Sequence, residues 1–329
     1  MTPAEVPAAY GGPGWRPRST SLREEMGSLW GGWGVAWEWG TLRAVLLHRP
    51  GQEVEGLEDA DAALMLGRLE PERMREEHRA LADFYREVGV EVYLVEPEGR
   101  VPPNLMFCRD LFFMTPEGAV LARPAGTARA GEERVIQARL AALGVPILLS
   151  VHGRGTFEGA DALWVDEGTV LLTTGLRTNE TGAAQVAGLL REMGVEVVRV
   201  DLPYGSMHLL GVLNLAGPDL AFAWSGRVPH RAVEALRARG FRVLFIPDEE
   251  EAVEGMALNF VTLGPYRVLM PAGCPRTRAF YEAAGLTCYE LEIGHLRRAA
   301  GGMGCLTGIL RRDRPSPLPT RFDGAGDMA

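Results

Sequence analysis

YREVGVEVYLV (residues 85–95) is the first of five stretches in which a helix-like segment ends in glycine and a run of alternating apolar residues follows at once. The other four are LAALGVPILLS (140–150), LREMGVEVVRV (190–200), LRARGFRVLFI (236–246) and YEAAGLTCYEL (281–291). Glycine is common at a helix C-terminus because it adopts the left-handed backbone at little cost. The alternation after it is typical of a half-buried strand. The chain therefore repeats one helix–strand junction, with 55, 50, 46 and 45 residues between successive glycines.

Two strands joined by a tight turn precede the helix of each repeat. Four such hairpins have Gly or Pro between apolar runs: FFMTPEGAVLARP (112–124), ALWVDEGTVLLTT (162–174), VLNLAGPDLAFAW (212–224) and FVTLGPYRVLMPA (260–272). A fifth would need both chain ends, LRAVLLHRP (42–50) and CLTGILRR (305–312). Self-similarity at a period of about 50 residues predicts a repeat or propeller architecture. We therefore expect a fivefold pseudo-symmetric α/β propeller of ββαβ units, closed by the N- and C-terminal strands so that no sheet edge is free.

One closed domain accounts for most of the chain. We predict a single catalytic domain over residues 30–313, preceded by a flexible extension (1–29) and followed by a flexible tail (314–329). The N-terminus lacks the apolar segment of a signal peptide, and no run approaches the roughly 20 apolar residues of a membrane helix. The four cysteines form no CxxC pair. These features predict a reduced, cytoplasmic protein.

The composition narrows the classes of partner. Hydrophobic residues make up 47% and charged residues 23%, which is ordinary for a globular protein with a sizeable core. The formal net charge of −9 argues against nucleic acid or a membrane surface and suits a cationic small substrate, although many proteins are acidic for solubility alone. No cofactor and no metal site are predicted, since the cysteine spacing matches no zinc pattern. The oligomeric state is left open, and a homo-oligomer is one option.

Polar residues of different chemistry recur just before the first strand of each hairpin. A purely structural repeat would tend to place similar residues there, whereas a thiol, an imidazole and carboxylates together favour covalent and acid–base catalysis. Cys108, Cys274 and Cys288 are interpreted as small buried hydrophobic residues. An acid before a strand often caps a turn, and this is a second interpretation of Asp161. The recurring residues are Asn104 and Asp110 (NLMFCRD), Glu158 and Asp161 (FEGAD), His208 (SMHLL), Asn259 (MALNF) and Cys305 (GMGCL).

These motifs, with GLRTN (175–179), resemble the guanidine-modifying branch of the pentein superfamily. That branch includes arginine deiminase, dimethylarginine dimethylaminohydrolase and the amidinotransferases. The resemblance covers residues 33–312, and its five short motifs occur in family order. It implies a five-bladed ring of ββαβ units and a hydrolase of the guanidine group of arginine or an N-methylated arginine.

The resemblance also implies residue roles. Cys305 attacks the guanidinium carbon to give a covalent thiouronium-like intermediate. His208 protonates the departing amine and then activates water, while Glu158 orients His208. The residues implied to bind substrate are Asp110 at the guanidinium, Arg177 at the α-carboxylate, Asn104 at the amino-acid end, and Asp161, Asn259 and Leu210 elsewhere in the site.

Leu210 departs from the pattern, because deiminases and amidinotransferases have an aspartate at this position, two residues after the histidine. We expect the apolar side chain to favour an N-alkylated guanidine or a ureido group over plain arginine. Two alternatives stay open. An amine could replace water as acceptor, which would make an amidinotransferase, and the ribosome anti-association factors share the fold without catalysis. The joint presence of Cys305, His208, Glu158 and Asp110 counts against the second alternative.

Overall fold

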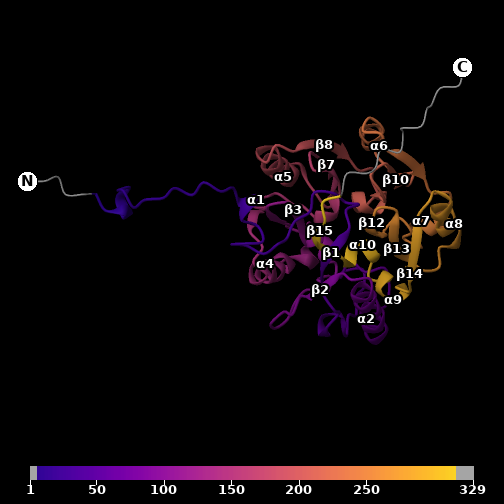
Figure 1. The fold of residues 1–329 in the computed structure, drawn as a ribbon. Helices are drawn as coiled ribbons and strands as arrows, with labels where there is room; N and C mark the ends of the chain where they lie inside the picture. The colour runs from indigo at the N-terminus through magenta and orange to yellow at the C-terminus, as the bar shows by residue number, and fades with distance from the viewer. Residues whose placement is uncertain (1–5, 316–329) are drawn as a thin grey trace, which may run out of the picture.

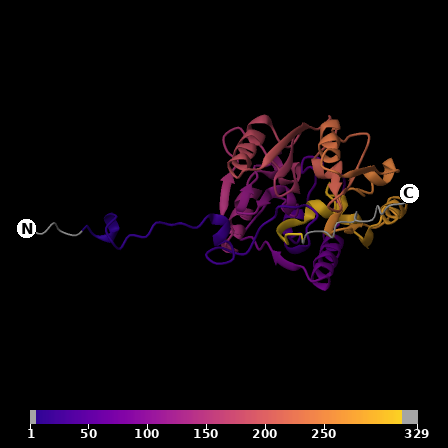
Figure 2. The same cartoon turned by 45° about the horizontal axis from the view of Figure 1, so that its top comes forward.

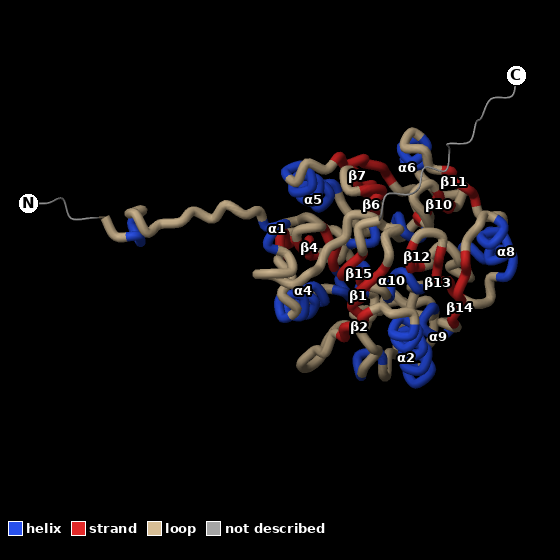
Figure 3. The backbone as a smooth tube through the Cα atoms, viewed as in Figure 1, coloured by secondary structure: helices blue, strands red, loops and turns tan. Residues whose placement is uncertain are grey.

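The computed structural model describes residues 6–315, which form a mixed α/β fold with five separate three-stranded sheets. In each sheet the middle strand runs antiparallel to the first strand of its unit and parallel to the last. The main helices lie at the periphery and the strands inside them (Figures 1 and 3). The predicted order of strand, strand, helix and strand is therefore confirmed in every unit.

The five units have similar lengths and the following bounds. The unit that uses both chain ends comprises β15 (Gly308–Arg312), β1 (Leu42–Leu47), α2 (Pro71–Glu87) and β2 (Glu91–Leu94). The next two comprise β3 (Phe112–Thr115), β4 (Gly118–Leu121), α4 (Glu132–Ala142) and β5 (Ile147–Ser150), then β6 (Ala162–Asp166), β7 (Thr169–Thr174), α5 (Glu180–Glu192) and β8 (Glu196–Asp201). The last two comprise β9 (Leu213–Leu215), β10 (Leu220–Ala223), α6 (His230–Arg237) and β11 (Arg242–Phe245), then β12 (Val261–Gly264), β13 (Arg267–Pro271), α8 (Pro275–Ala283) and β14 (Thr287–Leu291).

The repeated glycines end the helices as predicted. All five have a left-handed backbone, with φ between 71° and 99°, and each is followed by the last strand of its unit. An L-residue would be strained in this conformation. The local junction therefore sets where each helix stops and which strand follows it.

Pairing of the chain ends is confirmed. Strand β1 is antiparallel to β15, with Val45 opposite Ile309, and parallel to β2. The predicted closure without free edges is not confirmed, because the described residues form five separate sheets and each sheet keeps its own edge strands. The units are joined instead by buried apolar side chains, which form three core clusters.

The segment before β1 lies across several units. The indole of Trp33 donates to the carbonyl of Leu143 (2.7 Å), and that of Trp39 donates to the carbonyl of Val165 (3.2 Å). Buried Glu38 forms an ion pair with buried Arg109 (2.9 Å). This segment therefore belongs to the folded body.

The two predicted flexible ends are described only in part. Residues 6–20 are mostly exposed and extend away from the body, followed by α1 (Leu22–Glu25) (Figures 1 and 2). Residues 1–5 and 316–329 lie outside the described part of the chain, so the flexible ends and the domain limits stay predictions. Within residues 6–315, no helix combines the length and apolarity that crossing a membrane requires.

Short helices occupy several connections. Four of them, directly before a first hairpin strand, contact one another in sequence from α10 to α3 to η4 to η5. They are α10 (Met303–Leu306), α3 (Cys108–Leu111), η4 (Gly159–Asp161) and η5 (Leu209–Gly211). The remaining short helices are η1 (Ala8–Tyr10), η2 (Gln52–Val54), η3 (Thr127–Arg129), α7 (Glu249–Val253) and α9 (Gly294–Arg297).

Candidate active site

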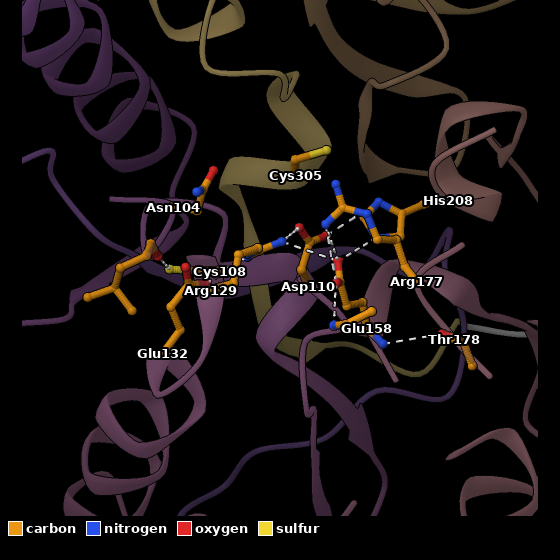
Figure 4. Close-up of polar contacts among 12 residues, drawn as sticks. Asn104, Cys108, Asp110, Arg129, Glu132, Glu158, Arg177, Thr178, His208 and Cys305 are labelled. Carbon is orange, nitrogen blue, oxygen red and sulfur yellow. Dashed lines mark hydrogen bonds and ion pairs between the residues drawn. The ribbon is translucent and has the colours of Figure 1, made fainter. Parts of the chain in front are cut away.

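The four contacting short helices bring residues from four units to one place. Asp110 lies in α3, Glu158 and His208 are the residues immediately before η4 and η5, and Cys305 lies in α10. Figure 4 shows the acids, His208 and Arg177 gathered together, with Cys305 beside them. Because each unit contributes the same structural position, residues far apart in sequence share one site.

His208 is held between two carboxylates. Its Nε2 lies 2.7 Å from Oε2 of Glu158, and its Nδ1 lies 3.8 Å from Oδ1 of Asp110. All three side chains are buried. Burial opposes the charged imidazole, but Asp110 and the hydrogen bond to Glu158 outweigh it and raise the pKa of His208 to about 9. His208 is therefore a proton donor at neutral pH.

Glu158 is ionised despite its burial. Arg129 and His208 overcome the cost of desolvation and hold the pKa of Glu158 well below its usual range. Arg177 adds a further contact, with Nη1 lying 3.3 Å from Oε1 of Glu158. Glu158 is thus a charged partner for the protonated His208 before any ligand binds.

The raised pKa of His208 predicts a pH-dependent stability. The imidazole titrates near 6.5 when unfolded and at about 9 when folded. Its contribution is therefore fully present below pH 6.5 and is lost as pH rises to about 9. Relative to a His208→Gln variant, we expect the free energy of unfolding to fall by on the order of 3 kcal/mol across this window. Urea unfolding at pH 6, 7.5 and 9 measures the difference, and parallel profiles for the two proteins would contradict it.

Cys305 is almost fully buried, with 6% of its surface exposed. Burial, followed by the charge of Asp110, raises the pKa of its thiol to about 12. The sulfur is therefore uncharged in the free site. A cation about 4 Å away would favour the thiolate by up to ~4 kcal/mol at an effective dielectric of 20. A positively charged ligand is thus suited to activating this sulfur.

A pocket connects the sulfur to two arginines. Its lining includes Cys305, Asp110, Asn104 and Arg177. Glu158 and His208 lie outside the lining, where His208 contacts Asp110 and Glu158 contacts Arg177. The Asn104 amide donates to the carbonyl of Ala63 (2.8 Å). The complete lining consists of Leu64, Asn104, Phe107, Asp110, Arg129, Arg177, Met207, Ala299, Ala300 and Cys305.

Three predicted substrate-binding residues do not line this pocket. Buried Asp161 accepts from the N–H of Leu209 (3.1 Å) and from the hydroxyl of Thr178 (2.6 Å), so it fixes the backbone next to His208. Leu210 is buried beside α10, since a Cβ on Gly304, the residue before Cys305, would lie 3.0 Å from its Cδ2. The third residue, Asn259, contacts Cys305 directly.

Arg129 and Glu132 were not predicted. Buried Arg129 lies 2.7 Å from Oδ2 of Asp110 and 3.2 Å from Oε2 of Glu158. Its other nitrogens donate to Glu132 at 2.9 and 3.0 Å. Burial raises the pKa of Glu132 to about 7. Arg129 could have been found by comparing repeats, because it lies between the hairpin and the helix of its unit, as Arg177 does in the next unit.

The acids and the imidazole offer a donor set for a metal ion. One atom each from Asp110, Glu158 and His208 lies within 4.8 Å of the others. The charges argue for a different use of these groups. A protonated imidazole cannot coordinate a metal, and Arg129 occupies one oxygen of each acid while Oδ1 of Asp110 has no hydrogen-bond partner among the described residues. The site is better suited to an organic cation.

Sequence comparison identifies related proteins. The family model described as N,N dimethylarginine dimethylhydrolase, eukaryotic, matches residues 68–270, which is more than half of the chain. The N(G),N(G)-dimethylarginine dimethylaminohydrolase of Pseudomonas aeruginosa is 27% identical over 245 residues, covering 74% of this chain and 90% of the relative. An arginine deiminase of Rhodococcus opacus is 34% identical over 275 residues, covering 78% of this chain and 60% of the relative.

Solved structures share the fold. The Pseudomonas aeruginosa dimethylarginine dimethylaminohydrolase in complex with citrulline has a TM-score of 0.69 at 24% identity, covering 82% of this chain and 99% of the other. The amidinotransferase SxtG from Microseira wollei has a TM-score of 0.67 at 17% identity, covering 86% and 98%. These two likenesses establish similarity of fold alone.

Proposed function

Because the chain belongs to the N,N-dimethylarginine dimethylhydrolase family, within the guanidine-modifying enzymes of the pentein superfamily, we propose that it hydrolyses the guanidine group of an N-methylated arginine. The chain is a hydrolase that acts on carbon–nitrogen bonds of linear amidines. The observation that carries the proposal is a buried thiol, Cys305, in one pocket with Asp110, next to a protonated His208 paired with Glu158.

The covalent step follows from the chemistry of these groups. When the cationic substrate binds, the thiol of Cys305 releases its proton to solvent, and the resulting thiolate forms a bond from Sγ to the guanidinium carbon. The bond from that carbon to the departing nitrogen breaks as His208 donates its proton to that nitrogen. The product of this step is a thiouronium bound to the enzyme. The neutral imidazole then takes one proton from water, whose oxygen attacks the same carbon. The C–S bond breaks to release a ureido product, and the remaining hydroxyl proton returns to Sγ, which restores the thiol and the protonated His208. One histidine suits both proton transfers.

Binding of the substrate uses the charges around the pocket. A carboxylate accepts charge-assisted hydrogen bonds from a planar guanidinium, which is the role proposed for Asp110, whereas Glu158 lies outside the pocket lining and would hold His208. Arg177 would hold the α-carboxylate, with Asn104 near the same end. The binding partner is therefore a small guanidino or ureido amino acid.

The substrate preference provides the test of the proposal. We expect methylated arginines to have a kcat/KM at least about tenfold above that of arginine, because an apolar Leu210 replaces the acid that would pair with an unsubstituted guanidinium. Mass spectrometry of the amine and ureido products from a panel of guanidino and ureido acids measures this. A Leu210→Asp variant should reduce the preference. Arginine outperforming the methylated forms tenfold would refute the substrate assignment.

Amidino transfer is the second candidate function, supported by the shared fold of the amidinotransferase SxtG. The same thiouronium could be resolved by an amine in place of water. Incubation with and without primary amines separates the two. Ureido product in the absence of added amine supports hydrolysis, and amidinated amine supports transfer.

We further propose that the five sheets are the blades of one α/β propeller and that residues 30–313 form a single catalytic domain. The sharing of one sheet by β1 and β15 supports this arrangement. A cytoplasmic location is proposed on the unpaired cysteines, since the structure describes all four as free thiols.

A further inference from the structure

Asn259 makes three hydrogen bonds to the segment that contains the thiol. Its main-chain carbonyl accepts from the N–H of Gly304 (3.0 Å), and its Oδ1 accepts from the N–H of Cys305 (3.0 Å). Its Nδ2 donates to Sγ of Cys305 (3.2 Å). A backbone N–H can only donate, so Oδ1 must face it. This fixes the amide orientation and places the NH₂ group on the sulfur.

The glycines before Cys305 leave room for this amide. A Cβ on Gly302 would lie 2.8 Å from both Cβ and Oδ1 of Asn259, and a Cβ on Gly304 would lie 3.0 Å from Oδ1. Distances under 3.0 Å force a neighbouring atom to move, and 3.0 Å is already tight. The glycine-rich start of α10 therefore fits closely around the Asn259 side chain, which explains part of the GGMGC sequence (301–305).

A second asparagine holds the first in place. Nδ2 of Asn214, on β9, donates to the carbonyls of Leu258 (3.1 Å) and Phe260 (2.9 Å), which flank Asn259. Both asparagines are buried. Two buried amides in series thus connect β9 to the sulfur, and each amide is satisfied by specific partners.

We propose that Asn259 is a positioning residue that orients Cys305 and stabilises its thiolate, with Asn214 fixing Asn259, an inference that rests on the proposed function. An N–H donor favours an anionic sulfur over a neutral one. Burial and Asp110 act in the opposite direction on the pKa of Cys305, whereas the Asn259 amide and the backbone of Gly302 lower it. The side chain of Asn259 hydrogen-bonds to Sγ and can be changed without touching the acids or arginines of the pocket.

Asn259→Asp keeps the acceptor oxygen of the side chain and removes its N–H donor, so the two contacts with Cys305 can be tested separately. The aspartate keeps an oxygen for the N–H of Cys305 but loses the donor to Sγ and adds a negative charge. We expect alkylation of Cys305 by iodoacetamide at a fixed pH between 7 and 9.5 to be at least about tenfold slower, since a rise of one pKa unit lowers the thiolate fraction tenfold. Asn259→Ala, which removes the donor without adding charge, should be slowed about threefold or more. The kcat should fall more than KM rises.

Asn179→Asp is the matched control, because Asn179 accepts from the N–H of Gly182 at the start of α5 through an oxygen that aspartate retains. Its alkylation rate should equal that of the unmodified protein. Unchanged alkylation in both Asn259 variants, with a raised KM, would overturn the inference and return Asn259 to substrate binding. If Asn259→Asp does not fold, Asn259→Ala alone decides. Alkylation does not require turnover, so the two proposals can fail separately. If the protein turned over no guanidino compound, the proposed function would be refuted. Slower alkylation of the Asn259 variants would still support the role of Asn259 in positioning Cys305.

Discussion

Replacing Cys305 with serine is expected to lower turnover by about four orders of magnitude or more. A serine hydroxyl is far less acidic than a thiol, and the buried site already raises the pKa of Cys305 to about 12. An alkoxide would therefore not be available even beside a bound cation. Product formation in a single-turnover assay measures the loss, and a haloacetamidine should label the unmodified protein at residue 305 but not the variant.

The chain offers a matched control for this change. Cys288, on β14, is only partly buried and does not line the pocket. Cys288→Ser should retain both turnover and labelling. Normal activity in Cys305→Ser, or a label on another cysteine, would exclude Cys305 as the nucleophile.

Replacing His208 with alanine is expected to lower kcat by about 10²- to 10⁴-fold, because the departing amine would lose its proton donor. The first step should survive for an amidine analogue whose leaving group needs no proton. The second step still lacks its base, so a covalent adduct on Cys305 should accumulate. Intact-protein mass spectrometry during turnover detects this adduct, and added imidazole should restore part of the rate.

Exposed His152 provides the comparison for this variant, because it lies outside the pocket lining. His152→Ala should leave kcat and adduct formation unchanged. If His208→Ala retained full activity with methylated arginines, His208 would have neither proton-transfer role.

The parts of the structure set by local chemistry were predictable. Each Gly junction and each hairpin turn lies within a dozen residues, so the unit order follows from patterns visible in the sequence. Pairing of β1 with β15 was also predictable, since four complete hairpins left one strand unpaired at each end. The convergence of Asp110, Glu158, His208 and Cys305 followed from placing one structural position of the repeat in space.

Features that depend on contacts between units were missed. Arg129 belongs to one unit and pairs with Glu158 of the next, so no sequence spacing predicts the pair. The side chain of Asn259 occupies the expected position but contacts the thiol, because its direction depends on the glycine-rich start of α10, before another unit. The separate sheets reflect the same limitation, since the contacts between units, such as the isolated bridge of Arg123 with Phe157, follow no repeating pattern in the sequence.

The pairing of the two chain ends has a consequence for biosynthesis. Strand β1 ends at Leu47 and its antiparallel partner β15 begins at Gly308, so the strands of the other four units are translated between them. Such distant pairing is slow to form because a long loop must close first. Cys305 directly precedes β15, so a nascent chain that has not yet reached this residue contains Asp110, Glu158 and His208 but lacks the thiol. The thiol of the candidate site is therefore added only after the other units have been translated.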